Sequence, residues 1–155
     1  MNNNRIINPN NNIVRDCKSR TTDKFYHDKD DGLLTIQYSG NANFVHELDH
    51  AGQFESGEIM LSTLGNGGIV DLSDESSAYK KQAAFDPISL PFSKSKAPTF
   101  SNDWILGIGD GKYKNHGITP TNVNSTKSEF QKSYPNKNIN FNNISNVKGL
   151  RYKNK

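Results

Sequence analysis

The chain has 155 residues, 32% of them hydrophobic, and a formal net charge of +3 with a sequence pI near 8.9. This length suits one domain with a small core, and the modest positive charge does not indicate nucleic-acid binding. Cys17 is the only cysteine, which excludes an internal disulfide and a thiolate zinc cluster. No apolar run reaches the length of a membrane span, and the N-terminus lacks the apolar stretch of a signal peptide.

The two ends of the chain differ in composition from its middle. Residues 1–20 are rich in asparagine and carry only two short apolar pairs, Ile6-Ile7 and Ile13-Val14. Such a composition is typical of a flexible arm or of a linker remnant. We therefore expect an arm at 1–20, one domain at 21–120, and an Asn/Lys-rich tail at 121–155 that is weakly ordered or docked.

Three segments of the middle region have the character of β-strands. Residues 33–38 contain the β-branched and aromatic side chains that strands favour. Residues 58–64 and 68–72 are apolar runs on either side of Gly65-Asn66-Gly67, a pattern that predicts a β-hairpin. A short sheet is therefore expected.

A first helix is expected over about 42–56. Gly57 can close it as the residue after its last turn, and Ser39, Asn41 or Asn43 can serve as its N-cap.

A second helix is expected over about 74–85. Ser73 is its expected N-cap, and Asp86-Pro87 ends it because proline disfavours a helical residue before it. The apolar residues 104–108 are expected to pack on the core. Sheet and helices together predict the fold class α+β, with the hairpin and sheet against the two helices.

Residues 46–50 read His-Glu-Leu-Asp-His and have the form H-E-x-x-H. Residues four apart lie on one face of a helix, with Cβ atoms roughly 5–6 Å apart, so His46 and His50 can hold one Zn²⁺. Glu47 lies one residue further round and can reach a metal-bound water without being a ligand. A catalytic zinc site has three protein ligands and a water, so one more ligand is expected.

The third ligand is expected to be a carboxylate, because the chain lacks the third histidine that metzincins place after this motif. Glu75 fits best, since it opens the second expected helix and would complete a His₂Glu site. Asp71 and Asp74 are competing carboxylates, and His116 is a more remote candidate.

The chemistry expected of such a site is hydrolysis of a peptide bond. Zinc activates a water and polarises the scissile carbonyl, while Glu47 takes a proton from the water and returns it to the leaving amine. Tyr79, Tyr113 and His116 are candidates for steadying the oxyanion.

Two points stay open at this level. Asp49 and Gln53 either orient a ligand imidazole or lie on a solvated helix face. The chain could also be an interaction module that binds zinc structurally, or no metal, and acts through its tail. Its 16 acidic and 19 basic residues make nucleic acid a weak candidate as partner.

Residues 44–53 and 74–82 resemble a known family pattern, H-E-x-x-H-A-x-Q followed by E-x-x-A-Y-x-x-Q. It belongs to small zincin-like metallopeptidase toxin domains of the gluzincin type, found in bacterial polymorphic toxins, including rearrangement-hot-spot and type VI secretion effectors. The resemblance extends over about residues 33–110. It implies zinc binding by His46, His50 and Glu75, with Glu47 as the catalytic acid and base.

The resemblance also implies a minimal zincin-like fold and a biological setting. The chain would be a secreted effector, or one delivered into a target cell by a larger carrier or secretion apparatus, and would cleave a protein or peptide substrate there. The producing cell would hold a cognate immunity protein that blocks the zinc cleft.

Overall fold

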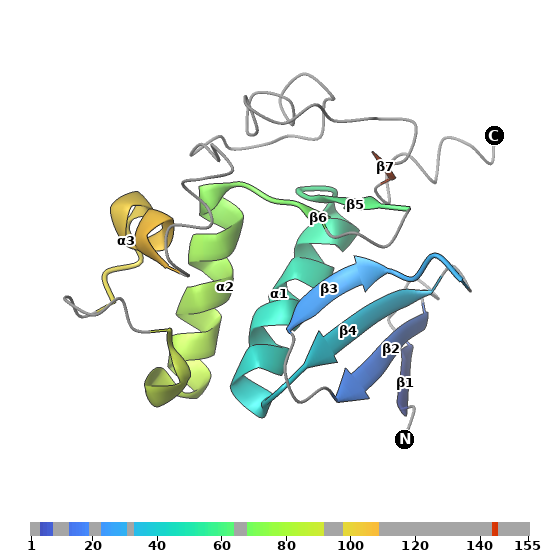
Figure 1. The fold of residues 1–155 in the computed structure, drawn as a ribbon, viewed down its shortest axis with the longest axis horizontal. Coiled ribbons are helices and arrows are strands. Elements are labelled where there is room, and N and C mark those ends of the chain that lie inside the picture. The colour runs from blue at the N-terminus through green and yellow to red at the C-terminus, as the bar shows by residue number, and fades with distance from the viewer. Residues whose placement is uncertain are drawn as a thin grey trace.

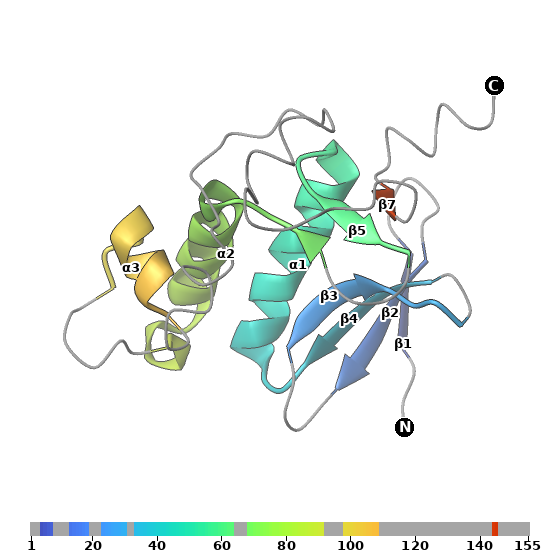
Figure 2. The same cartoon turned by 45° about the horizontal axis from the view of Figure 1, so that its top comes forward.

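The computed structural model describes residues 4–7, 13–18, 23–30, 33–63, 68–91, 98–108 and 144–145. They form an α+β fold in which α1 lies between a four-stranded sheet and α2, with α3 on the far side of α2 (Figure 1; Figure 2). The fold class expected from the sequence is confirmed, including a short sheet, a hairpin, a helix that carries the H-E-x-x-H motif and a second helix that carries Glu75.

The larger sheet has the strand order β1-β2-β4-β3. Its strands are β1 (Asn4–Ile7), β2 (Ile13–Lys18), β3 (Lys24–His27) and β4 (Leu34–Tyr38). β2 and β4 are parallel, and the other two pairs are antiparallel.

Both β1 and β2 lie inside the segment 1–20 that the sequence analysis assigned to an arm. Where the structure describes it, that segment is part of the sheet, because β2 pairs along its length with the buried strand β4. The short apolar pairs did not reveal this pairing, since the partner strand is distant in the sequence. The remaining domain boundaries stay predictions.

The smaller sheet has the order β6-β5-β7. β5 (Met60–Ser62) and β6 (Gly68–Ile69) are antiparallel and form the expected hairpin. β7 (Ile144–Ser145) pairs with the other edge of β5, so the tail supplies one of the described strands.

Helix α1 (Asn41–Ser56) ends as expected, since Gly57 adopts the left-handed conformation at φ 80° and its N–H bonds to carbonyls of the last turn. Its start differs from the expectation. Gly40 occupies the N-cap and no side chain caps the helix. Ser39 and Asn43 instead donate hydrogen bonds to the Asp23 carboxylate, at 2.8 and 3.1 Å, which ties the start of α1 to the residue before β3.

Helix α2 (Leu72–Phe85) begins earlier than expected, because its N-cap is Asp71 and not Ser73. Asp71 Oδ1 accepts from the backbone N–H of Asp74, and Asp74 Oδ2 accepts from the backbone N–H of Asp71. This reciprocal arrangement is a capping box, which satisfies backbone donors that the first turn leaves free. The helix ends before Asp86 as predicted, and a 3₁₀ turn (Pro87–Ser89) follows.

Two hydrophobic clusters stabilise the fold on either side of the helix pair. One lies between the sheets and α1; its buried members are Phe25, Ile36, Ala51, Phe54, Ile59 and Leu61. The other lies between α2 and α3 (Asn102–Gly107); its buried members are Met60, Leu72, Tyr79, Leu90, Trp104, Ile105 and Ile108. The expected packing of residues 104–108 on the core is therefore confirmed.

Phe54 is expected to anchor α1 to the sheet. Its ring is 1% exposed and meets Phe25 edge-on at 5.9 Å between centroids. Phe54→Ala should lower the free energy of unfolding by about 3–5 kcal/mol through lost apolar contact and a residual cavity. Denaturant unfolding followed by the fluorescence of Trp104, the single tryptophan, measures this change.

Phe85→Ala provides the matched control, because the Phe85 ring is 59% exposed at the end of α2. We expect a change of about 0.5 kcal/mol or less. Equal losses for the two variants would contradict the assignment of Phe54 to the core.

Candidate metal centre

The periodicity of α1 places three polar side chains on the face that meets α2. His46, His50 and Gln53 are spaced by four and three residues, so they follow one stripe of the helix. Glu75 lies in the first turn of α2 and points at this stripe. One Glu75 carboxylate oxygen lies 3.6 Å from His46 Nε2, and the other lies 3.7 Å from His50 Nε2.

His46, His50 and Glu75 are therefore brought together, and each is buried. One ligand atom of each lies within 4.8 Å of the other two, which makes the cluster able to hold a metal ion. Ligands that share one tetrahedral zinc at about 2.0–2.2 Å lie roughly 3.3 Å apart. The two His–Glu separations are close to that spacing.

The capping box explains why Glu75, and neither neighbouring aspartate, faces the histidines. Asp71 and Asp74 are buried, and each bonds to backbone N–H groups at the start of α2. Glu75 follows directly and points to the other side of the turn, toward α1. The sequence contained a usable signal for this cap, since two aspartates three apart match the spacing of a capping box. His116 and Tyr113 lie outside the described residues.

His50 is held by a hydrogen bond on the ring nitrogen that faces away from Glu75. Its Nδ1 lies 2.7 Å from Gln53 Oε1, and both side chains are buried. His46 differs, because its Nδ1 is buried with no hydrogen-bond partner in the described part of the chain. The His46 ring instead packs edge-on against the Tyr79 ring, with 4.4 Å between centroids.

Glu47 lies on the next stripe of α1, toward the sheet, and its carboxyl is buried. Burial raises the pKa of this carboxyl to about 7. The interaction with His50 and the hydrogen bond from the backbone N–H of Phe25 lower this pKa, whereas the carboxylates of Glu75 and Asp23 raise it. A carboxyl with a pKa near neutrality can both accept and return a proton at physiological pH.

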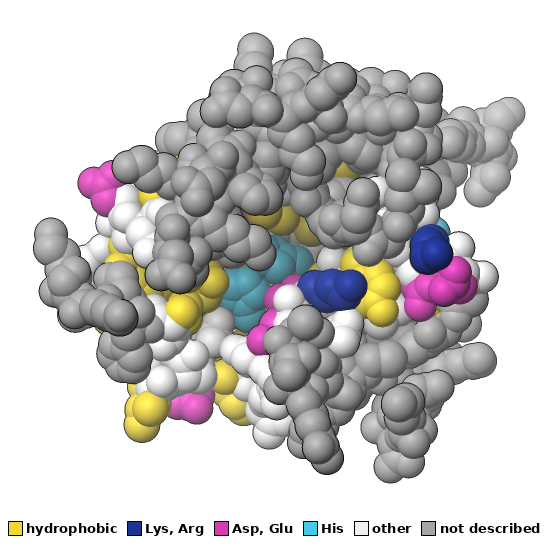
Figure 3. Space-filling view, viewed as in Figure 1, with side chains coloured by type: hydrophobic (Ala, Val, Ile, Leu, Met, Phe, Trp, Pro, Cys, Tyr) yellow, Lys and Arg dark blue, Asp and Glu magenta, His cyan; other side chains and the backbone are white. Residues whose placement is uncertain are grey.

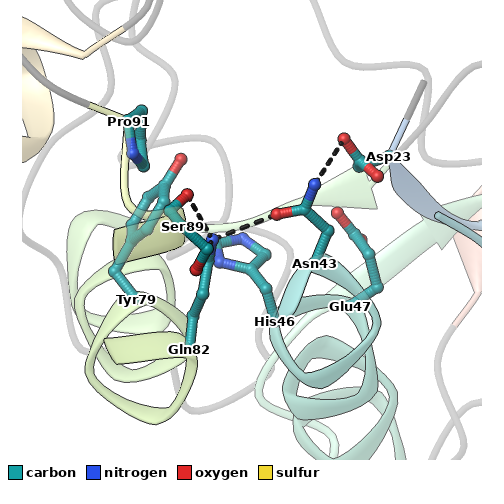
Figure 4. A pocket seen from close by; sticks show the side chains of 8 residues that line it. All are labelled: Asp23, Asn43, His46, Glu47, Tyr79, Gln82, Ser89 and Pro91. Carbon is teal, nitrogen blue, oxygen red and sulfur yellow. Dashed lines mark hydrogen bonds between the residues drawn. The ribbon is translucent and has the colours of Figure 1, made fainter. Parts of the chain in front are cut away.

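A cavity of about 320 Å³ opens beside His46 and Glu47. Figure 4 shows Glu47, Asn43 and Asp23 on one side, Tyr79, Gln82, Ser89 and Pro91 on the other, and His46 between them. Gln82 Nε2 of α2 donates a hydrogen bond to Asn43 Oδ1 of α1 at 3.0 Å, which connects the two helices across the cavity lining. In the space-filling view, histidine side chains are visible in a hollow over the junction of α1 and α2, beside acidic side chains (Figure 3).

The residues present fit a metal such as zinc. Two imidazole nitrogens and one carboxylate are the donor set His₂Glu of catalytic zinc sites, and this mixture of nitrogen and oxygen donors suits zinc better than calcium or magnesium. Glu75 also places a carboxyl group in a buried site, where a bound cation would stabilise its ionised form.

Comparisons with known protein families, with curated proteins and with solved structures found no match. Within the residues that the structure describes, no helix combines the length and the apolar content that crossing a bilayer requires.

Glu75 and Asp74 can be distinguished as ligands by the effect of each side chain on metal affinity. Glu75→Gln should weaken zinc binding by about a hundredfold or more, because it removes the anionic ligand. Asp74→Asn should stay within a few-fold of wild type, because an asparagine oxygen can still accept from the Asp71 N–H. Titration against a zinc-chelating dye measures both affinities. Weaker binding by Asp74→Asn than by Glu75→Gln would contradict the assignment.

Proposed function

We propose that the protein is a zinc-dependent metallopeptidase. The observation that supports this most directly is the convergence of His46, His50 and Glu75, with Glu47 beside them at the edge of a cavity. A structural zinc site has four protein ligands, whereas a catalytic one has three and an open position. The described residues place three potential ligands and a neighbouring acid together, which supports a catalytic rather than a structural site.

In this proposal the side chains have distinct tasks. His46, His50 and Glu75 would hold the zinc, which when bound supplies an acidified water and an electrophile for the scissile carbonyl. Glu47 takes a proton from the attacking water and passes it to the leaving amine, a role for which its position beside His46 and the cavity is suited.

Tyr79 is proposed to stabilise the oxyanion. It lies four residues after Glu75 on α2, packs against His46 and lines the cavity beside Glu47. A phenol placed near the metal can donate a hydrogen bond to the oxygen that gains charge. Its ring is also buried against Trp104, so the same residue contributes to the core.

The biological setting is proposed from the sequence resemblance. The two motifs in residues 44–53 and 74–82 resemble those of toxin domains, so we propose an antibacterial effector that cleaves a protein in a target cell. A carrier or secretion apparatus would deliver it, and an immunity protein would protect the producer by covering the zinc cleft.

A second candidate function is an interaction module that binds zinc structurally or binds no metal. The extensive hydrogen bonding of the polar groups between α1 and α2 supports it, because such groups can also serve stability alone. The two candidates differ in what they require of Glu47, which is essential only for catalysis.

Glu47→Gln should retain one zinc per chain and lose hydrolysis. An amide cannot accept the proton from the water, so cleavage of unfolded, fluorescently labelled casein should fall about 10²- to 10⁴-fold. Glu58→Gln is the matched control, because it makes the same change at an exposed position. Equal rates for wild type and Glu47→Gln, with zinc bound to both, would favour the interaction module.

Expression in bacteria tests the toxin proposal. Wild type should arrest growth after induction, and Glu47→Gln should permit growth at the same protein level. Toxicity that does not depend on Glu47 would argue against a hydrolytic toxin, as would normal growth of cells that contain active peptidase.

A further inference from the structure

We propose that Gln53 positions two ligands of the metal centre. It determines the tautomer of the His50 imidazole and fixes the location of the Glu75 carboxylate. This inference extends the proposed metal-binding function, because it concerns how the ligands are held before any metal binds. It rests on the hydrogen bonds of a single buried side chain at the contact between α1 and α2.

The first of these bonds defines the tautomer of His50. Gln53 Oε1 lies 2.7 Å from His50 Nδ1, and an amide oxygen can only accept. The proton of the neutral imidazole must therefore reside on Nδ1. The lone pair is then on Nε2, the atom that lies 3.7 Å from a Glu75 oxygen.

The amide of Gln53 has only one orientation that satisfies its surroundings. Its Nε2 lies 3.0 Å from the backbone carbonyl oxygen of Asp74 and 3.4 Å from Asp49 Oδ2, both of which are acceptors. A flipped amide would place an oxygen against these two oxygens. The surroundings therefore direct Oε1 toward His50.

The bond to the Asp74 carbonyl connects the same side chain to the second helix. Asp74 directly precedes Glu75, so this bond fixes the turn of α2 from which the carboxylate ligand projects. Gln53 thereby links the ligand of one helix to the ligand of the other.

An ion pair supports the far side of this network. The Asp49 carboxylate is 4% exposed and bonds to the Lys81 ammonium of α2, whose side chain is 59% exposed. A buried carboxylate needs such a partner, and here the cation comes from the solvent-facing side of α2. Lys81 bonds to one oxygen of this carboxylate, and Gln53 donates to the other.

His46 lacks a comparable partner. Its Nδ1 bonds to none of the described residues, and packing against Tyr79 holds the ring. The positioning effect of Gln53 should therefore be confined to His50 and Glu75. A residue that only stabilised the helix pair would have no such selective effect on one of the two histidines.

Gln82 provides a matched control for that distinction. It is a second buried glutamine whose amide ties α2 to α1, through Asn43 Oδ1 at 3.0 Å, and it also donates to Ser89 at 3.2 Å. It bonds to no proposed ligand. Gln53→Met and Gln82→Met thus remove similar inter-helix hydrogen bonds, and only the first touches a ligand imidazole.

The experiment combines two measurements. Nitrogen-15 NMR of metal-free wild type, labelled at histidine, reports which ring nitrogen of His50 carries the proton. Competition against a zinc-chelating dye gives the zinc affinity of wild type, Gln53→Met and Gln82→Met. We expect a proton on His50 Nδ1, affinity about 10- to 100-fold weaker in Gln53→Met, and a few-fold change or less in Gln82→Met.

Three outcomes would overturn the proposal: a His50 proton on Nε2 in wild type, unchanged affinity in folded Gln53→Met, or equal losses in both variants. If Gln53→Met does not fold, the His50 tautomer measured in wild type decides whether the proposal holds. Wild type that binds no zinc would refute the proposed metallopeptidase, while the tautomer measurement would still test the role of Gln53.

Discussion

The contact between α1 and α2 buries ionisable and amide side chains where a helix pair ordinarily buries apolar ones. In the described residues, all of the buried polar side chains except Thr35 belong to these two helices or to the N-cap of α2. Burying such groups is costly unless each finds a partner. The hydrogen bonds of Gln53 and Gln82 and the Asp49–Lys81 ion pair meet most of this requirement and bring the helices into register.

The hydrophobic clusters make this polar contact possible. The cluster around Phe54 fixes α1 on the sheet, and the cluster around Trp104 fixes α2 against α3. The apolar surface is thus buried on the outer sides of the helix pair, which leaves the inner faces available for chemistry. Tyr79 belongs to both regions, since it lies in the second cluster and contacts His46.

Local sequence patterns predicted α1, α2 and the hairpin because those signals act over a few residues. Gly57, Asp86-Pro87 and the spacing of the H-E-x-x-H motif each specify backbone or side-chain geometry within one or two turns. Pairing of β2 with β4 was missed because it depends on a partner that is distant in the sequence. The cap of α2 was misplaced because Ser73 and Asp71 are both good N-caps, and the spacing of Asp71 and Asp74, which form reciprocal bonds, was not used to distinguish them.

The sequence by itself determined that His46 and His50 share one helix face, with Glu47 beside them, because helical periodicity alone requires it. It favoured Glu75 as the third ligand but did not exclude Asp71 and Asp74, since that choice depends on how α2 docks on α1. Tertiary structure decided it by occupying both aspartates in the capping box and turning Glu75 toward the histidines. Helical spacing alone also places Gln53 beside His50, but only the packing of the two helices shows that Gln53 is buried and bonded to the backbone of α2.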